Sequence, residues 1–373
     1  MATWKLRLLS QTFKDGCAWE YRMPGGVVVP MGSGPPAFRV DAATERGVAA
    51  MESLDELRIA RAYCDGDLNL EGDILAALSL RTALTDRHPF LRFWSERLQP
   101  FLRGQVECDR EWIQDHYDED PAFYQMFLDR KYRCYSQAQF AGSAEPLETG
   151  IERKLSAAVE STGLRPGSRV LDVGAGWGAF VEFAGRLGIQ VTALTICRVS
   201  ERFVSGLIAR QGLPCQVIYE HLLEHRSAEP YDAIVNLGVT EHLPDYRATI
   251  GVYARILKSG GRIYLDASAA RSRQSTATAT LIFSGNGRFL NLPEYVRAVH
   301  DSPFEILALG NDTEDYRRTM ECWASNLDEA RATIIERFGE RQYRRFRLYL
   351  WAGAHAFSKR ELEAYHMVLR KRD

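Results

Sequence analysis

The chain of 373 residues lacks long apolar runs, closely spaced cysteine pairs and an excess of charge of one sign. A helix needs roughly 20 apolar residues to span a bilayer, so we predict no transmembrane helix. Residues 1–10 are mixed and have no apolar signal-peptide core, which predicts a cytoplasmic protein. The formal net charge of −2 gives no general attraction to nucleic acid, and none is predicted as a partner.

Metal and disulfide frameworks are also missing from the sequence. The seven cysteines are scattered and form no C-x-x-C pair, which is typical of reduced thiols. His221 and His225 are four residues apart but have no third ligand nearby, and Glu241-His242 lacks the spacing of a zinc motif. We therefore predict no metal site.

The patterning predicts two domains, at residues 1–105 and 106–373. In the first domain, Trp19–Val29 alternates around a Pro-Gly-Gly turn as a hairpin does. Leu54–Cys64 and Ile74–Leu84 have the apolar spacing of helices. Residues 1–105 are thus predicted to form a small α+β domain.

Strands and helices alternate through the second domain. The predicted strands begin at Arg169 and lie at Gln190–Leu194, Gln216–Tyr219, Ala233–Leu237 and Arg262–Leu265, and the predicted helices lie near Phe180, at Ser200–Gln211 and at Ala248–Leu257. This order predicts a doubly wound α/β fold, in which ligands bind beyond the carboxyl ends of the strands. The stretch Tyr316–Leu369 is predicted to be helical throughout.

The strand at Val170 leads directly into a loop with three glycines. Glycines allow backbone N–H groups to approach a ligand closely. The third glycine comes two residues after the second, not three as in the dinucleotide fingerprint. This form resembles the first motif of S-adenosylmethionine (AdoMet) methyltransferases, and a dinucleotide loop is the alternative. The residues that would hold the methionine part of the cofactor are Asp172, Gly174, Gly176 and Gly178.

Further motifs extend this resemblance over nearly the whole chain. They are His116-Tyr117-Asp118, Phe123-Tyr124, Phe127-Leu128-Asp129, Tyr135-Ser136, Trp177 in the loop, Leu194-Thr195, Gly238 to His242, and Tyr316, Thr319 and Trp323. In this order they resemble the cyclopropane fatty acid synthases and mycolic acid cyclopropane synthases. The resemblance implies a seven-stranded class I AdoMet methyltransferase fold with a small N-terminal α+β domain and a helical C-terminal cap.

The resemblance also implies a reaction, in which AdoMet gives a methyl group to a double bond in an acyl chain of a membrane phospholipid. An alkene is a poor nucleophile, so positive charge develops in the transition state, and aromatic faces and a carboxylate can stabilise it. Glu241 and Tyr316 are implied in this role, although position alone leaves Glu241 equally open to a structural role. The remaining implied cofactor contacts are Tyr135, Ser136, Leu194, Thr195 and, at the adenine end, His221.

Two positions depart from the family pattern. A cysteine that helps to bind bicarbonate is replaced by Gln137, and a histidine with the same role is replaced by Asp266. An anionic aspartate would repel bicarbonate unless its pKa were raised, so we doubt that bicarbonate binds in the usual way. One hypothesis is that Asp266 accepts a proton from a carbon beside the methylated cation, which would give a methyl-branched or methylene chain. The alternative is that Asp266 only forms a cap or an ion pair.

Arg341, Arg344, Arg345 and Arg347 form a basic cluster among aromatic residues. They are predicted either to contact anionic lipid headgroups or to form a solvated helix face opposite a core stripe. Peripheral contact with the inner face of the membrane follows from the first interpretation. A homodimer is implied only by the resemblance.

The predicted activity is therefore that of an AdoMet-dependent C-methyltransferase acting on an unsaturated fatty acyl chain. A cyclopropane synthase with a rearranged base site is the second hypothesis. A methyltransferase for a soluble natural product and a non-catalytic lipid-binding protein are two more, the last disfavoured by the intact glycine loop and Glu241.

Overall fold

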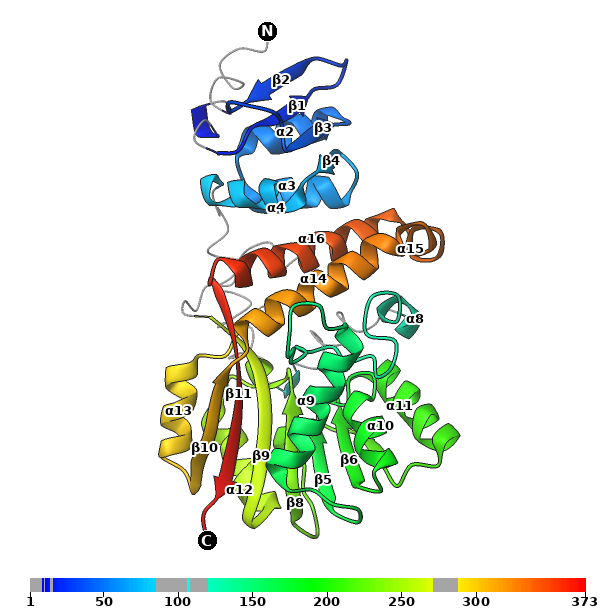
Figure 1. The fold of residues 1–373 in the computed structure, drawn as a ribbon, viewed down its shortest axis with the longest axis vertical. Helices are drawn as coiled ribbons and strands as arrows, with labels where there is room; N and C mark the ends of the chain where they lie inside the picture. The colour runs from blue at the N-terminus through cyan, green and yellow to red at the C-terminus, as the bar shows by residue number, and fades with distance from the viewer. Residues whose placement is uncertain (1–8, 10, 14–15, 85–105, 108–119, 271–287) are drawn as a thin grey trace.

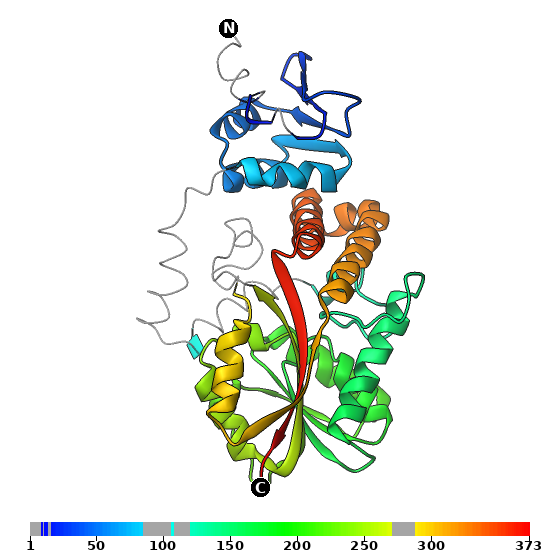
Figure 2. The ribbon, with the colours of Figure 1, turned by 60° about the vertical axis from the view of Figure 1, so that its left-hand side comes forward.

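The computed structural model describes residues 9, 11–13, 16–84, 106–107, 120–270 and 288–373. Two sheets lie at opposite ends of an elongated molecule, and the helices near the C-terminus lie between them (Figures 1 and 2). The motif at His116–Asp118 lies outside the described residues, as does the boundary predicted at residue 105, which remains a prediction.

The N-terminal sheet has four strands in the order β2-β1-β3-β4. Its elements are β1 (Trp19–Arg22), β2 (Val28–Met31), β3 (Phe38–Ala42), α2 (Glu45–Ser53), α3 (Glu56–Cys64), β4 (Leu68–Gly72) and α4 (Ile74–Ser79), followed by a 3-10 turn at Leu80–Ala83. Trp19 stacks on Phe38 in the core of this unit, and side chains of Thr44, Asp55 and Asp73 cap the three helices. The predicted hairpin and both predicted helices are present.

The larger sheet has seven strands in the order β10-β11-β9-β8-β5-β6-β7. The strands are β5 (Arg169–Val173), β6 (Gln190–Thr195), β7 (Gln216–Tyr219), β8 (Tyr231–Leu237), β9 (Leu257–Ala270), β10 (Phe304–Asn311) and β11 (Leu362–Lys371). Strands β5 to β9 are parallel, and β11 is antiparallel to both of its neighbours. The doubly wound sheet predicted from the sequence is confirmed.

Helices cover both faces of this sheet and divide the core in two. One core lies under α9 (Leu147–Thr162), α10 (Ala179–Arg186) and α11 (Arg198–Gln211), and the other lies under α12 (Tyr246–Ile256) and α13 (Leu292–His300). A short helix, α8 (Pro121–Tyr124), adds aromatic side chains to the first core.

The C-terminal region differs from the prediction. Helices α14 (Thr313–Glu329), α15 (Arg331–Phe338) and α16 (Glu340–Ser358) form the expected cap, but the helical prediction is wrong beyond Ser358. The chain turns at Arg360, whose φ is 57°, and continues as β11 between β9 and β10. Hydrogen bonding to two strands distant in sequence outweighs the helical propensity of this segment.

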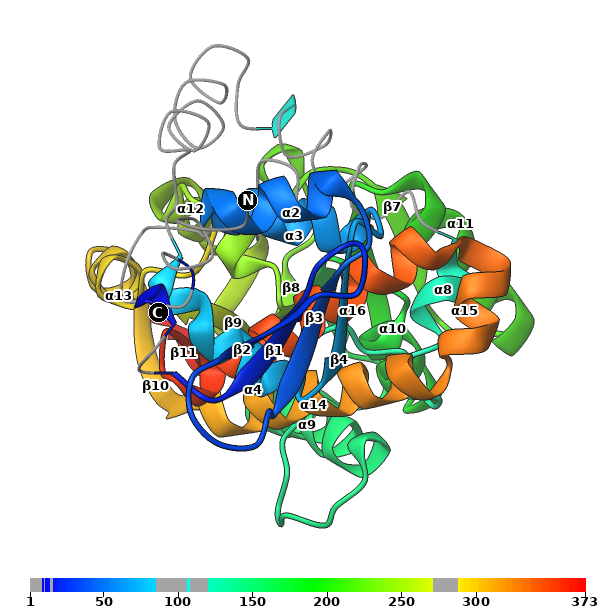
Figure 3. The ribbon, with the colours of Figure 1, turned by 90° about the horizontal axis from the view of Figure 1, so that it is seen from above.

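The basic cluster on α16 joins the cap to the N-terminal unit, which lies over this helix (Figure 3). Arg344 donates to the carbonyl oxygens of Tyr63 and Leu68 at 3.2 and 2.9 Å, and Arg347 donates to the Tyr63 hydroxyl at 3.1 Å. The side chains of Arg344 and Arg347 are only 13% and 16% exposed. These two arginines neither form a solvated helix face nor point to a lipid surface, so both predictions are wrong for them.

Candidate active site

The glycine loop lies at the carboxyl end of β5, in the middle of the sheet. The backbone N–H groups of Gly174 and Ala175 donate to the Leu194 carbonyl at 3.1 and 2.7 Å, and the Ser200 hydroxyl donates to the Gly176 carbonyl at 2.6 Å. These bonds tie the loop to β6 and α11. A Cβ built on Gly176 would meet nothing within 4 Å, so this part of the loop faces open space. Hydrogen bonds thus hold the loop in place beside a cavity, and we call this loop the cofactor cradle.

That cavity contains most of the predicted cofactor-binding residues. It has a volume of about 140 Å³. Its walls include the predicted residues Tyr135, Ser136, Asp172, Gly174, Gly176, Leu194, Thr195 and His221. Gly178 instead begins α10, and a Cβ there would lie 2.8 Å from Leu207, so its position serves the packing of this helix against α11. The residues gathered around the cavity fit a nucleoside and an amino-acid group bound across the loop.

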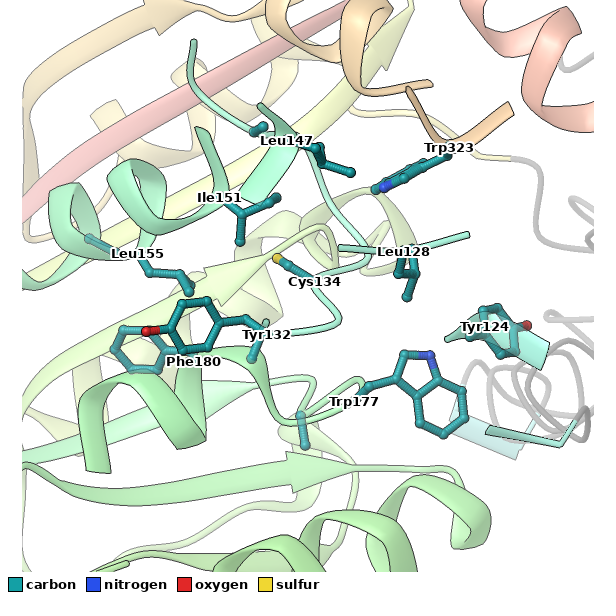
Figure 4. Close-up of a cluster of buried hydrophobic side chains, with 14 of the residues drawn as sticks. Tyr124, Leu128, Tyr132, Cys134, Leu147, Ile151, Leu155, Trp177, Phe180 and Trp323 are labelled. Carbon is teal, nitrogen blue, oxygen red and sulfur yellow. The ribbon is translucent and has the colours of Figure 1, made fainter. Parts of the chain in front are cut away.

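Aromatic side chains close the site on the side of α8. Trp177 is turned toward Tyr124 (Figure 4), and their ring centroids are 5.0 Å apart. Asp129 accepts backbone hydrogen bonds from Tyr132 and Cys134, both at 2.6 Å, and so shapes the segment that carries Tyr135 and Ser136. The predicted aromatic motifs are thus mainly core residues that position the cavity wall.

Asp172 is fully buried at the end of β5. Burial raises the pKa of its carboxyl group to about 8. A cationic group placed beside it would offset this penalty and favour the ionised form. His221 accepts a hydrogen bond from the Leu223 backbone N–H through Nδ1, at 3.1 Å, and caps the 3-10 turn that ends the cavity wall.

Glu241 lies in the 3-10 turn Thr240–His242 that follows β8. Its Oε1 accepts from the backbone N–H and the hydroxyl of Ser268, at 3.2 and 2.9 Å, while Oε2 has no hydrogen-bond partner among the described residues. Burial raises the pKa of Glu241 to about 6, against the opposing effect of its hydrogen bonds. The sequence left its role open, and this buried oxygen without a partner is consistent with a group that faces a reacting centre.

Asp266 belongs to a buried network that the sequence analysis missed. Lys154, which is also fully buried, places its Nζ 3.5 Å from Asp266 Oδ2 and donates to the hydroxyl of Ser136 at 2.6 Å. Burial raises the pKa of Asp266 to about 6, with Glu241 and Asp312 adding to the rise and Lys154 opposing it. This geometry favours the ion-pair alternative for Asp266.

None of the four predicted catalytic residues, Gln137, Glu241, Asp266 and Tyr316, is among the residues that line the cofactor cavity. Gln137 is buried and donates through Nε2 to Asp312 at 3.4 Å, while its Oε1 has no hydrogen-bond partner in the part of the chain that the structure describes. Asp312 also pairs with His366 Nδ1 at 2.7 Å. Tyr316 is in the first turn of α14 and stacks on Phe357 at 4.6 Å. The roles of Gln137 and Tyr316 remain predictions.

Within the described ranges, no three His, Cys, Asp or Glu side chains are grouped so that they could hold a metal ion. No helix in the same ranges is long and apolar enough to cross a membrane.

The fold and the cavity define the chain as a class I AdoMet-dependent methyltransferase. It belongs to the mycolic acid cyclopropane synthetase family, whose model matches residues 105–367. The family resemblance, the fold class and the cofactor predicted from the sequence are therefore confirmed. When it is bound, AdoMet supplies an electrophilic methyl group.

Individual relatives are distant. The chain is 26% identical to Rv3720 of Mycobacterium tuberculosis, named a probable fatty acid methyltransferase, over 90% of this chain and 87% of that protein. It is 24% identical to a sphingolipid C9-methyltransferase of Candida albicans, over 83% of this chain and 64% of the fungal protein. The cyclopropane synthase MmaA2 from Mycobacterium tuberculosis superposes with a TM-score of 0.66 at 25% identity, covering 70% of this chain and 98% of MmaA2.

The glycine loop offers a direct test of cofactor binding. Gly174 has a φ of +88°, and a Cβ there would lie 2.4 Å from Val239, so Gly174→Ala strains the backbone and moves the cavity wall. We expect this variant to weaken AdoMet binding at least about tenfold, measured by isothermal titration calorimetry. Gly142→Ala is the control, because a Cβ at Gly142 meets nothing within 4 Å. Equal affinities for both variants would contradict the proposed cradle.

Proposed function

We propose that this enzyme transfers a methyl group from AdoMet to a double-bond carbon of an unsaturated fatty acyl chain, which gives a methyl-branched or methylene product. The main support is the buried carboxylate of Glu241, which has one oxygen without a hydrogen-bond partner among the described residues. Its chain neighbours Val239 and His242 line the cofactor cavity. Such a group stabilises positive charge in a site that excludes water. Relatives named as a fatty acid methyltransferase and a sphingolipid methyltransferase support a lipid substrate.

Glu241 is also the better placed of the two buried carboxylates to act as the base. Neither Asp266 oxygen nor Glu241 Oε2 has a hydrogen-bond partner among the described residues, but Asp266 has an ion-pair partner in Lys154, at 3.5 Å. A pKa near 6 leaves most Glu241 side chains ionised at neutral pH and able to accept a proton. In this scheme the alkene carbon takes the methyl group and the neighbouring carbon becomes cationic. Loss of the proton on the methylated carbon to Glu241 gives a methyl-branched alkene. A methylene group forms if that hydrogen first moves as hydride to the cationic carbon and the new methyl group then loses a proton to Glu241.

The replacement of a cysteine and a histidine by Gln137 and Asp266 supports a product other than a cyclopropane. Glu241, Asp266 and Asp312 are close enough that the other two carboxylates raise the pKa of Asp266. This acidic surrounding opposes the entry of a bicarbonate anion, although Lys154 compensates one of the charges.

A deuterium experiment tests the proposed product. The purified enzyme is incubated with an unsaturated phospholipid and AdoMet that carries a trideuterated methyl group. A proton lost from a chain carbon leaves all three deuterons in a methyl branch, whereas loss from the new methyl group leaves two, in a methylene group or in a ring. Mass spectrometry counts the deuterons, and NMR distinguishes the methylene group from the ring. A cyclopropane would contradict the proposed product, and an unmodified lipid would contradict the proposed substrate.

A further inference from the structure

A second and larger cavity lies between the N-terminal unit and α16. Its volume is about 550 Å³, within the range of sites that hold a whole small ligand. Most of its described lining is apolar and includes Ile59, Leu78, Leu348 and Ala352. Two elements distant in sequence thus present apolar side chains to a common space.

Polar contacts hold the two walls of this cavity in place. Arg344 on α16 bonds to backbone carbonyls of the N-terminal unit, and Arg341 pairs with Asp65 at 2.8 Å. An apolar group placed between these walls would be removed from water and would gain dispersion contacts with both of them. Three charged groups of the lining pair with one another, because Arg81 lies 3.1 Å from Glu56 and 3.6 Å from Glu361, and Arg345 and Arg360 also line the cavity. The remaining interior suits an aliphatic ligand.

Tyr349 connects this cavity with the candidate active site. It lines the large cavity and neighbours Tyr135, which lines the cofactor cavity. Burial and, to a smaller extent, the charge of Glu241 raise the pKa of Tyr349. A third connection is Ala270, which lines the large cavity at the end of β9, the strand that carries Ser268.

We propose that the cavity between α16 and the N-terminal unit holds the part of the substrate acyl chain that extends beyond the reacting double bond. This inference rests on the proposed function, because it assumes that an acyl chain reaches Glu241. It gives the N-terminal unit a direct part in substrate binding, with Tyr349 at the passage between the two cavities.

Photo-crosslinking of the full chain tests the location. The probe is a phosphatidylglycerol with one unsaturated chain that carries a diazirine near its methyl end, presented in detergent micelles. We expect labelled peptides from α3, α4 and α16, identified by mass spectrometry. Methylation of the same probe is measured in parallel. The inference is overturned if the label is found only on other peptides or on none, whether or not the probe is methylated. A lack of methylation contradicts the proposed function instead.

Filling the cavity tests the same inference by kinetics. Ala352→Trp places a bulky ring on the α16 wall, and we expect kcat/KM for an 18-carbon unsaturated chain to fall at least about tenfold. Ala332→Trp, on the exposed surface of α15, is the matched control. AdoMet binding should be equal in both variants, which verifies that the catalytic domain is folded. Equal kcat/KM values in the two variants would overturn the inference. If Ala352→Trp does not fold, the crosslinking experiment still tests the inference, because it uses the unmodified chain.

Discussion

Replacing Glu241 by glutamine should lower kcat for methyl transfer by about 10²–10³-fold, the usual loss when a preorganised electrostatic group is removed. The side chain keeps its size and its contact with Ser268, but it loses the negative charge that stabilises the cation. Because ionised Glu241 is the active form, kcat of the unmodified enzyme should fall as the pH drops below about 6. The glutamine variant should lack this decrease.

The control for this experiment is Glu160→Gln, at an exposed position near the end of α9. AdoMet affinity, measured by calorimetry, should change by less than about twofold in both variants, since Glu241 is proposed to act on the substrate. A glutamine variant that keeps most of its kcat, with an unchanged pH profile, would assign Glu241 a structural role.

Local patterns in the sequence predicted the central part of the fold. The predicted strand Gln216–Tyr219 matches β7, and the predicted helix Ser200–Gln211 begins two residues inside α11. Inner parallel strands such as β6, which is buried beyond its first residue, give short apolar runs that helices separate, and this alternation also identifies the half-buried edge strand β7. The glycine loop was predicted equally well, because the spacing of its glycines follows from the close approach of the backbone to a ligand.

The last strand could not be predicted in the same way. Leu362–Lys371 follows a long helix without a glycine or proline between them, and Arg360 adopts the left-handed conformation that ends the helix. Its pairing with β9 and β10 involves residues 54 to 108 positions away in the sequence, from the pair Asn311 and Tyr365 to the pair Arg262 and Arg370. Such long-range pairing leaves little trace in local propensity.

Lys154 shows the corresponding limit for the site. It shares one face of α9 with Ile151, Leu155 and Ala158, all of which are buried, and a lysine on such a face is a signal of a buried partner. The spacing could have identified Lys154 as unusual. The identity of its partner, Asp266, depends on how β9 packs against α9, which the sequence does not give.

The pair of Lys154 and Asp266 leads to the largest expected effect on stability. Replacing Lys154 by methionine leaves a buried carboxylate uncompensated, and we expect a loss of about 3–5 kcal/mol in the free energy of unfolding at pH 8, measured with urea. Lys131→Met is the matched control, since Lys131 pairs with Glu152 at 2.7 Å but both side chains are 44% exposed. Solvent screens a surface pair of this kind, so we expect Lys131→Met to change the stability far less than Lys154→Met, although its distance is shorter than the 3.5 Å of the buried pair.

The pH dependence and a double variant identify the cause of this loss. The pKa of Asp266 is raised to about 6 in the folded protein, so its contribution to stability is complete below about pH 4 and is lost as the pH rises through 6. Without Lys154 the pKa rises further, and the deficit of Lys154→Met should therefore shrink between pH 8 and pH 5. Adding Asp266→Asn should restore about 1.5–3 kcal/mol at pH 8, because it removes the unpaired charge. If the loss of stability in Lys154→Met is the same at both pH values and is not relieved by Asp266→Asn, its cause is the packing around the lysine side chain and not the charge of Asp266.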